Sequence, residues 1–198
     1  MRHALIALPA AALLALSASA APPVKTSAAQ RGKYLALIGG CSDCHTPKKM
    51  GPQGPEADTT RLLSGHPQGE PVTAQATLSA PWMAATNMHL TAWSGPWGIS
   101  YAANLTPDPV TGLGVPNLWT EALFIKAMRT GKHIGTSRPI LPPMPWQEIA
   151  QMTDQDLKAL WAYLRSIPPV RNQVPDPVMA PPPPGPPGAP AAAPPSTK

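Results

Sequence analysis

Two cysteines and a histidine stand close together in this chain, at Cys41, Cys44 and His45. Two thiols separated by two residues and followed at once by an imidazole form the C-x-x-C-H spacing of covalent haem c attachment. Each thiol adds to one vinyl group of the haem, and the two-residue gap matches the separation of the vinyls. The adjacent imidazole is then held at the iron as an axial ligand. The motif therefore predicts one covalent haem c.

Three other uses of a cysteine pair fit this sequence less well. A redox dithiol follows a strand in an alternating strand and helix pattern, whereas this pair follows a predicted helix. A zinc site needs two more nitrogen or sulfur ligands, and a chain with only 2 Cys would draw them from the scattered His66, His89 and His133. A disulfide across so short a loop would be strained and would stabilise little. An exported, non-haem binding module that uses the pair structurally stays open as an alternative.

The iron of a haem takes a second axial ligand as well, and the sequence offers several thioethers and the histidines His66, His89 and His133. Met144 lies in a run of six residues, 141–146, in which three prolines fix the backbone torsions. Such a loop has little ordering entropy left to lose, so we predict that Met144 is the second ligand opposite His45. Met128 falls on the apolar face of a predicted helix and is expected in the core. The alternatives that stay open are Met83, Met88 and a histidine.

Three amphipathic helices are predicted to position these residues. The first opens with a capping box from Ser27 to Gln30 and ends at a glycine pair directly before Cys41. The other two carry apolar residues at helical spacing and acidic residues in the first turn, which suits the helix dipole. The second is expected from about Trp119 to Thr130, and the third from a Thr153 cap to about Arg165.

The segment 46–103 has little periodicity and much proline and glycine. We expect a long loop insert with at most a short helix or hairpin. Its few charges and its Trp82, Trp93 and Trp97 indicate that it is packed on something apolar rather than disordered.

The composition divides the chain into three parts. Residues 1–20 have a short basic start, an apolar run and a small-residue cleavage site, which is typical of a signal peptide. The apolar run is too short to span a membrane, so we expect a periplasmic protein without a transmembrane anchor. Residues 21–170 have the size of one domain. Residues 171–198 are rich in proline and alanine and are expected to form a disordered tail.

The net charge of the chain indicates what kind of partner it binds. The formal net charge is +5, with basic residues clustered at 25–49 and 126–138. Acidic partners are therefore favoured, and we expect a redox partner protein with an acidic docking surface. Binding to nucleic acid fits poorly with an exported chain.

The elements together resemble a class I cytochrome c. The matching parts are the helix that leads into the C-x-x-C-H motif, the methionine loop, and a closing helix that contains Leu160-Trp161-Ala162-Tyr163-Leu164. The resemblance implies an all-α fold of three to five helices around one haem, here with the long loop insert, and makes 21–170 a monohaem cytochrome c domain. It also implies that the first and last helices cross, with Gly32 and Tyr34 near Trp161 and Tyr163.

A closer similarity is to the cytochrome c subunits of periplasmic alcohol, aldehyde and gluconate dehydrogenases. It is carried by Asn104-Leu105-Thr106-Pro107-Asp108, by Thr111-Gly112-Leu113-Gly114 and by Pro142-Pro143-Met144-Pro145. Such subunits carry several C-x-x-C-H motifs, whereas this chain has one.

This similarity implies an electron carrier rather than an enzyme. Single electrons would pass between a dehydrogenase or respiratory donor and an acceptor, with the chain acting alone or as a subunit of an oxidoreductase complex. A haem enzyme or gas sensor with an open axial position is the alternative. We hypothesise further that a tryptophan, Arg138 or the Asn104 amide donates to the haem propionates.

Overall fold

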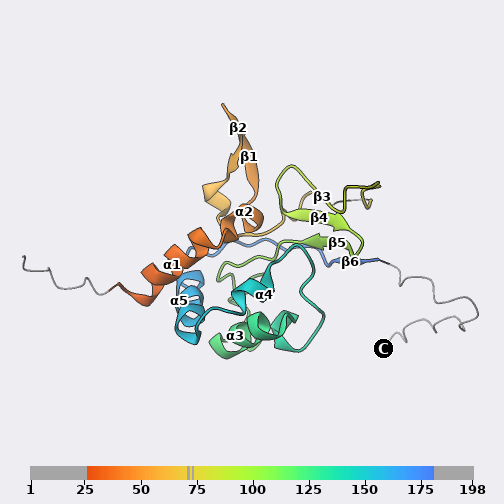
Figure 1. Ribbon diagram of the computed structural model, residues 1–198. Helices are drawn as coiled ribbons and strands as arrows, with labels where there is room; N and C mark the ends of the chain where they lie inside the picture. Colours follow the sequence, from red (N-terminus) through yellow and green to blue (C-terminus); the bar gives the residue numbers. More distant parts are fainter. Residues whose placement is uncertain (1–25, 71, 73, 181–198) are drawn as a thin grey trace, which may run out of the picture.

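The computed structural model describes residues 26–70, 72 and 74–180. The expected signal peptide at 1–20 lies outside the described residues. Figure 1 shows most of the helices gathered at the lower left of the molecule, one small hairpin projecting at the top and a second small sheet on the right. The helices are α1 (Ala28–Ile38), α2 (Cys41–His45), α3 (Glu121–Thr130), α4 (Trp146–Ile149) and α5 (Asp154–Leu164), with two 3-10 turns, η1 (Thr59–Arg61) and η2 (His133–Gly135).

The predicted helix starts are confirmed by their caps. The capping box of α1 is complete, because the Ser27 hydroxyl accepts from the Gln30 amide while the Gln30 side chain accepts from the Ser27 amide. Thr120 caps α3 and Thr153 caps α5 in the same way, each accepting from the amide three residues on. The starts of the three helices are therefore determined by side chains within four residues of the cap.

Helices α1 and α5 cross at Gly32, as the resemblance implies. A Cβ atom on Gly32 would lie 1.9 Å from the Ala159 carbonyl oxygen and 2.7 Å from the Tyr163 Cβ, so only glycine lets the two backbones approach this closely. At the edge of the crossing, the Arg31 guanidinium lies 3.0 Å from the Asp156 carboxylate. Tyr34 is 53% exposed, and its ring lies beneath the Arg31 guanidinium.

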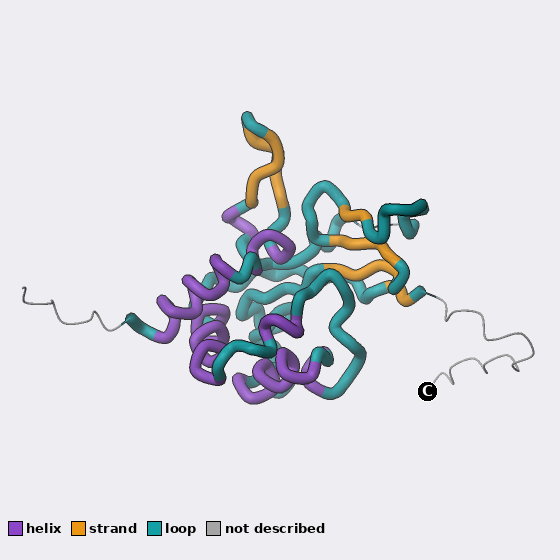
Figure 2. The backbone as a smooth tube through the Cα atoms, in the orientation of Figure 1, coloured by secondary structure: helices purple, strands orange, loops and turns teal. Residues whose placement is uncertain are grey.

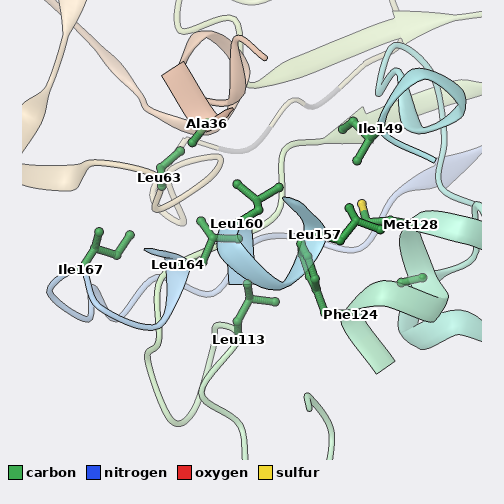
Figure 3. Packing of buried hydrophobic residues seen from close by; sticks show 11 residues of the cluster. Ala36, Leu63, Leu113, Phe124, Met128, Ile149, Leu157, Leu160, Leu164 and Ile167 are labelled. Carbon is green, nitrogen blue, oxygen red and sulfur yellow. The ribbon is translucent and has the colours of Figure 1, made fainter. Parts of the chain in front are cut away.

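The hydrophobic core lies between α5 and α3. Figure 3 shows Leu157 of α5 beside Phe124 and Met128 of α3, with Leu160 of α5 in the same cluster. Partly buried side chains from distant segments pack against the same cluster, among them Cys41, Met144, Trp161 and Tyr163. The C-x-x-C-H motif and the methionine loop therefore share one apolar cluster, although about a hundred residues separate them. The other buried members of the cluster are Ala36, Leu63, Leu113, Ala127, Ile149, Leu164 and Ile167.

The insert has more structure than the loop with at most a short helix or hairpin that we expected, because it forms strands of two sheets, and the fold is therefore not all-α. Strands β1 (Lys48–Gly51) and β2 (Gly54–Ala57) form one antiparallel hairpin. Strands β3 (Ala85–Thr86), β4 (Ala92–Gly95), β5 (Gly98–Tyr101) and β6 (Val178–Met179) form a second sheet in that order, drawn in orange in Figure 2. Each strand has four residues or fewer, too few for an alternating pattern to be recognised.

The packed unit also extends past the predicted boundary at residue 170. The Asn172 amide donates to the carbonyls of Ser64 at 2.7 Å and His66 at 2.8 Å, and β6 pairs with β5. Residues 171–180 thus belong to the folded domain, although we predicted that the disordered tail begins at residue 171. Composition misled here, because hydrogen bonds of Asn172 and the pairing of β6 hold a proline-containing segment in place. Residues 181–198 lie outside the described part of the chain.

No helix among the described residues has the length and apolar character that crossing a membrane requires.

Candidate haem site

The two cysteines and the histidine lie together on α2. Gly40 precedes this short helix in the left-handed region, with φ of +64°, which lets the chain turn sharply from α1 into the motif. Cys41 and Cys44 are both free and partly exposed. Burial raises the pKa of each thiol, with a further contribution from the nearby Asp43 carboxylate. The pair is therefore held as two neutral thiols that remain available for reaction.

His45 is held in one orientation by a hydrogen bond at Nδ1, which leaves its other ring nitrogen free. Its side chain is only 7% exposed, and Nδ1 lies 2.7 Å from the Ala103 carbonyl oxygen. A carbonyl only accepts, so the proton is on Nδ1 and Nε2 carries the free lone pair. Burial lowers the pKa of His45, which favours the neutral imidazole that metals bind. Within the described chain, Nε2 has no hydrogen-bond partner.

The segment 63–65 forms hydrogen bonds with the end of the cysteine motif. The Thr46 hydroxyl accepts from the Leu63 amide at 3.0 Å, and the Gly65 amide donates to the His45 carbonyl at 2.8 Å. A Cβ on Gly65 would lie 2.5 Å from the Ala102 carbonyl oxygen, so this glycine lets the segment lie against the chain that carries Ala103. Sequence reasoning missed Ala103 because a backbone carbonyl has no residue-type signature.

Met144 is half-buried in the proline loop and packs against the core cluster that Cys41 also contacts. The open alternatives Met83 and Met88 are 68% and 63% exposed, and Met128 is in the core as expected. Neither of these two methionines belongs to the core cluster that Met144 and Cys41 share. Met144 therefore stays our prediction for the second axial ligand.

Two of the three histidines considered as alternative ligands, His66 and His89, are engaged elsewhere. His66 is fully buried, and its Nε2 donates to the Glu70 carbonyl while Nδ1 accepts from the Thr91 hydroxyl. His89 accepts from the Lys48 amide through Nδ1 and faces the Glu70 carboxylate through Nε2. Both nitrogens of each ring are used, and no group of three or more candidate ligands forms a metal site among residues 26–70, 72 and 74–180. The zinc interpretation thus finds no support in the described chain.

Asn104 is a structural residue, contrary to our hypothesis that it donates to the haem propionates. Its amide nitrogen donates to the Val170 carbonyl at 2.8 Å and to the Thr111 hydroxyl at 3.1 Å. Its oxygen accepts from the amide and hydroxyl of Thr106. The side chain is buried and its bonding capacity is used inside the protein, so it has no donor left for a propionate.

The residues present fit a covalent haem c. Two free thiols flank the first turn of α2, the adjacent imidazole has its ligand nitrogen free, and a thioether packs on the same apolar cluster. This donor set of soft sulfur and imidazole suits haem iron.

Comparison with known proteins identifies relatives, although no family model matches the chain. A nicotinate dehydrogenase subunit of Pseudomonas putida is 31% identical over 146 residues, which are 74% of this chain and 9% of that protein. The cytochrome c subunit of the quinone alcohol dehydrogenase of Gluconacetobacter polyoxogenes is 30% identical over 80% of this chain and 26% of its own length. The gluconate 2-dehydrogenase cytochrome c subunit of Pantoea cypripedii is 29% identical over 79% and 27%. The chain is a c-type cytochrome related to these subunits.

This cytochrome spans only about a quarter, or less, of the length of these relatives. The relatives named as cytochrome c subunits support haem binding and electron transfer in general. The sequence resemblance to the cytochrome c subunits of dehydrogenases is confirmed by these relatives.

Proposed function

We propose that this cytochrome carries one covalently attached haem c, with His45 and Met144 as axial ligands, and passes single electrons in the periplasm between a dehydrogenase and an acceptor. The observation that carries the proposal is the buried His45, whose Nδ1 is bound to Ala103 and whose Nε2 is free beside two free thiols. Bound haem supplies a one-electron iron couple. Once Cys41 and Cys44 have formed thioethers with the haem vinyl groups, no side chain of this protein makes or breaks a covalent bond during electron transfer.

The residues determine how such a centre behaves. His45 is kept neutral and in one tautomer, so it binds without first losing a proton. A thioether from Met144 is a soft ligand that favours Fe(II), and a Met/His pair raises the reduction potential. Two protein ligands leave no open position for O₂ or peroxide, which favours electron transfer over catalysis at the iron.

Haem content tests this proposal directly. We expect protein made in a host with cytochrome c maturation to retain one haem per chain after acid denaturation, as measured by mass spectrometry. The native reduced protein should show a low-spin c-type spectrum that carbon monoxide does not change at neutral pH. A colourless product would favour the non-haem binding module, and carbon monoxide binding would favour the enzyme or sensor with an open position.

We also propose that the redox partner is a dehydrogenase subunit with an acidic docking surface. The relatives are named as dehydrogenase subunits, and Lys126, Lys132 and Arg138 are exposed on and after α3. Charges of one sign raise the rate of encounter with an oppositely charged protein by about 10-fold to 1000-fold at low salt.

Reduction by an acidic electron-transfer protein should therefore slow by about tenfold or more as salt is raised. Stopped-flow kinetics at several salt concentrations measure this. Reduction by an uncharged hydroquinone is the control and should not change. A double charge reversal, Lys126→Glu with Lys132→Glu, should reduce both the rate and its salt dependence. A rate that is independent of salt would contradict the acidic partner.

A further inference from the structure

The second sheet of the insert contacts the methionine loop through one side chain. Ser100 lies on β5, is 8% exposed, and donates from its hydroxyl to the Pro142 carbonyl at 2.6 Å. The same hydroxyl accepts from the Trp97 indole N–H at 3.2 Å. Its single proton is thus directed at the loop, because the indole can only donate. Pro142 is two residues before Met144.

The methionine loop has few means of holding itself in place. Pro142, Pro143 and Pro145 have no backbone N–H, so they cannot donate hydrogen bonds that would brace the loop. Within it, the Met144 amide donates to the Leu141 carbonyl at 3.3 Å. The Pro142 carbonyl receives its hydrogen bond from outside the loop, from Ser100. The loop therefore depends on the sheet for part of its anchorage.

The donor is itself held firmly. Ser100 pairs with Trp93 across the β4–β5 hairpin. The Trp97 ring lies so close to Gly95 that a Cβ there would be 2.5 Å from it, and the Ala180 amide donates to the Trp97 carbonyl at 2.9 Å. The orientation of the indole N–H is thus determined by β4 and by the chain after β6.

We propose that Ser100, oriented by Trp97, is a positioning residue that holds the Met144 loop for axial ligation, so that the insert acts as a support for the sulfur ligand. This inference rests on the proposed His45 and Met144 ligation. It predicts that loss of the hydroxyl weakens the iron–sulfur bond without preventing haem attachment, because Ser100 lies on a different element from the cysteine motif.

The test is an alkaline titration of the ferric protein, in which the sulfur-to-iron absorption band disappears as another ligand replaces methionine. We expect Ser100→Ala to lower the midpoint by about one pH unit, a tenfold shift that corresponds to the loss of one hydrogen bond. Trp97→Phe should shift it in the same direction by less. Ser100→Thr retains the hydroxyl and should restore a midpoint near that of the wild type.

Ser94→Ala is the matched control. Ser94 is a buried serine of the neighbouring strand β4, and its hydroxyl accepts from the Ala76 amide at 2.9 Å rather than contacting the methionine loop. It should lower thermal stability without moving the titration midpoint. If Ser100→Ala also lowers thermal stability without moving the titration midpoint, Ser100 has only a structural role and the inference is overturned. If the wild type lacks the band altogether, the His45 and Met144 ligation fails, and this inference fails with it.

Discussion

Replacing Met144 with alanine is expected to abolish the sulfur-to-iron band of the ferric protein while the haem stays attached through Cys41 and Cys44. The thioether is the only part of the side chain that a metal binds, and alanine lacks it. Loss of a soft ligand that favours Fe(II) should lower the reduction potential by more than about 59 mV, which is a tenfold change for one electron. The reduced variant should also bind carbon monoxide. Absorption spectra and a redox titration measure these effects.

Met152→Ala is the control for this experiment. Met152 is also partly buried and packs against the same core cluster as Met144, so its truncation removes a similar volume from the same region. It should cost stability, by roughly 2–5 kcal/mol if the cavity stays open, and leave the band in place. A band that survives in Met144→Ala and disappears in Met83→Ala or Met152→Ala would assign the ligand to that other methionine.

Replacing Gly32 with alanine is expected to destabilise the fold strongly. Its new Cβ would meet the Ala159 carbonyl oxygen at 1.9 Å, and a backbone atom of a helix cannot move aside as a flexible side chain can. The crossing of α1 and α5 must then open, and the Arg31–Asp156 ion pair at its edge is strained too. We expect a loss of about 3 kcal/mol in the free energy of unfolding, measured by urea unfolding of the haem-loaded protein.

Gly69→Ala provides the comparison. No atom lies within 4 Å of a Cβ placed on Gly69, so the same chemical change meets open space there. It should alter the free energy of unfolding by no more than about 0.5 kcal/mol. Equal effects of the two substitutions would show that the crossing tolerates a methyl group and that α1 and α5 are less closely packed than the structure indicates.

The resemblance to class I cytochromes predicted the helices around the motif correctly but not the sheets. The caps at Ser27, Thr120 and Thr153 are recognisable because the side chain and the amide that it binds are three residues apart. The insert lacks such local signals, and its strands pair through short hairpins and with β6, which follows far along the chain. Composition therefore predicted a loop there and a disordered segment at 171–180.

By itself, the sequence determined the parts of the candidate site that lie next to one another. Cys41, Cys44 and His45 need only a turn of helix to come together, and their residue types state their chemistry. Only the tertiary structure decided which group holds His45, because Ala103 is 58 residues away and contributes a carbonyl that every residue has. The same is true of Ser100 and Pro142, 42 residues apart. Side chains carry chemical identity that can be recognised in a sequence, whereas a backbone acceptor gains its role only from where the packed chain places it.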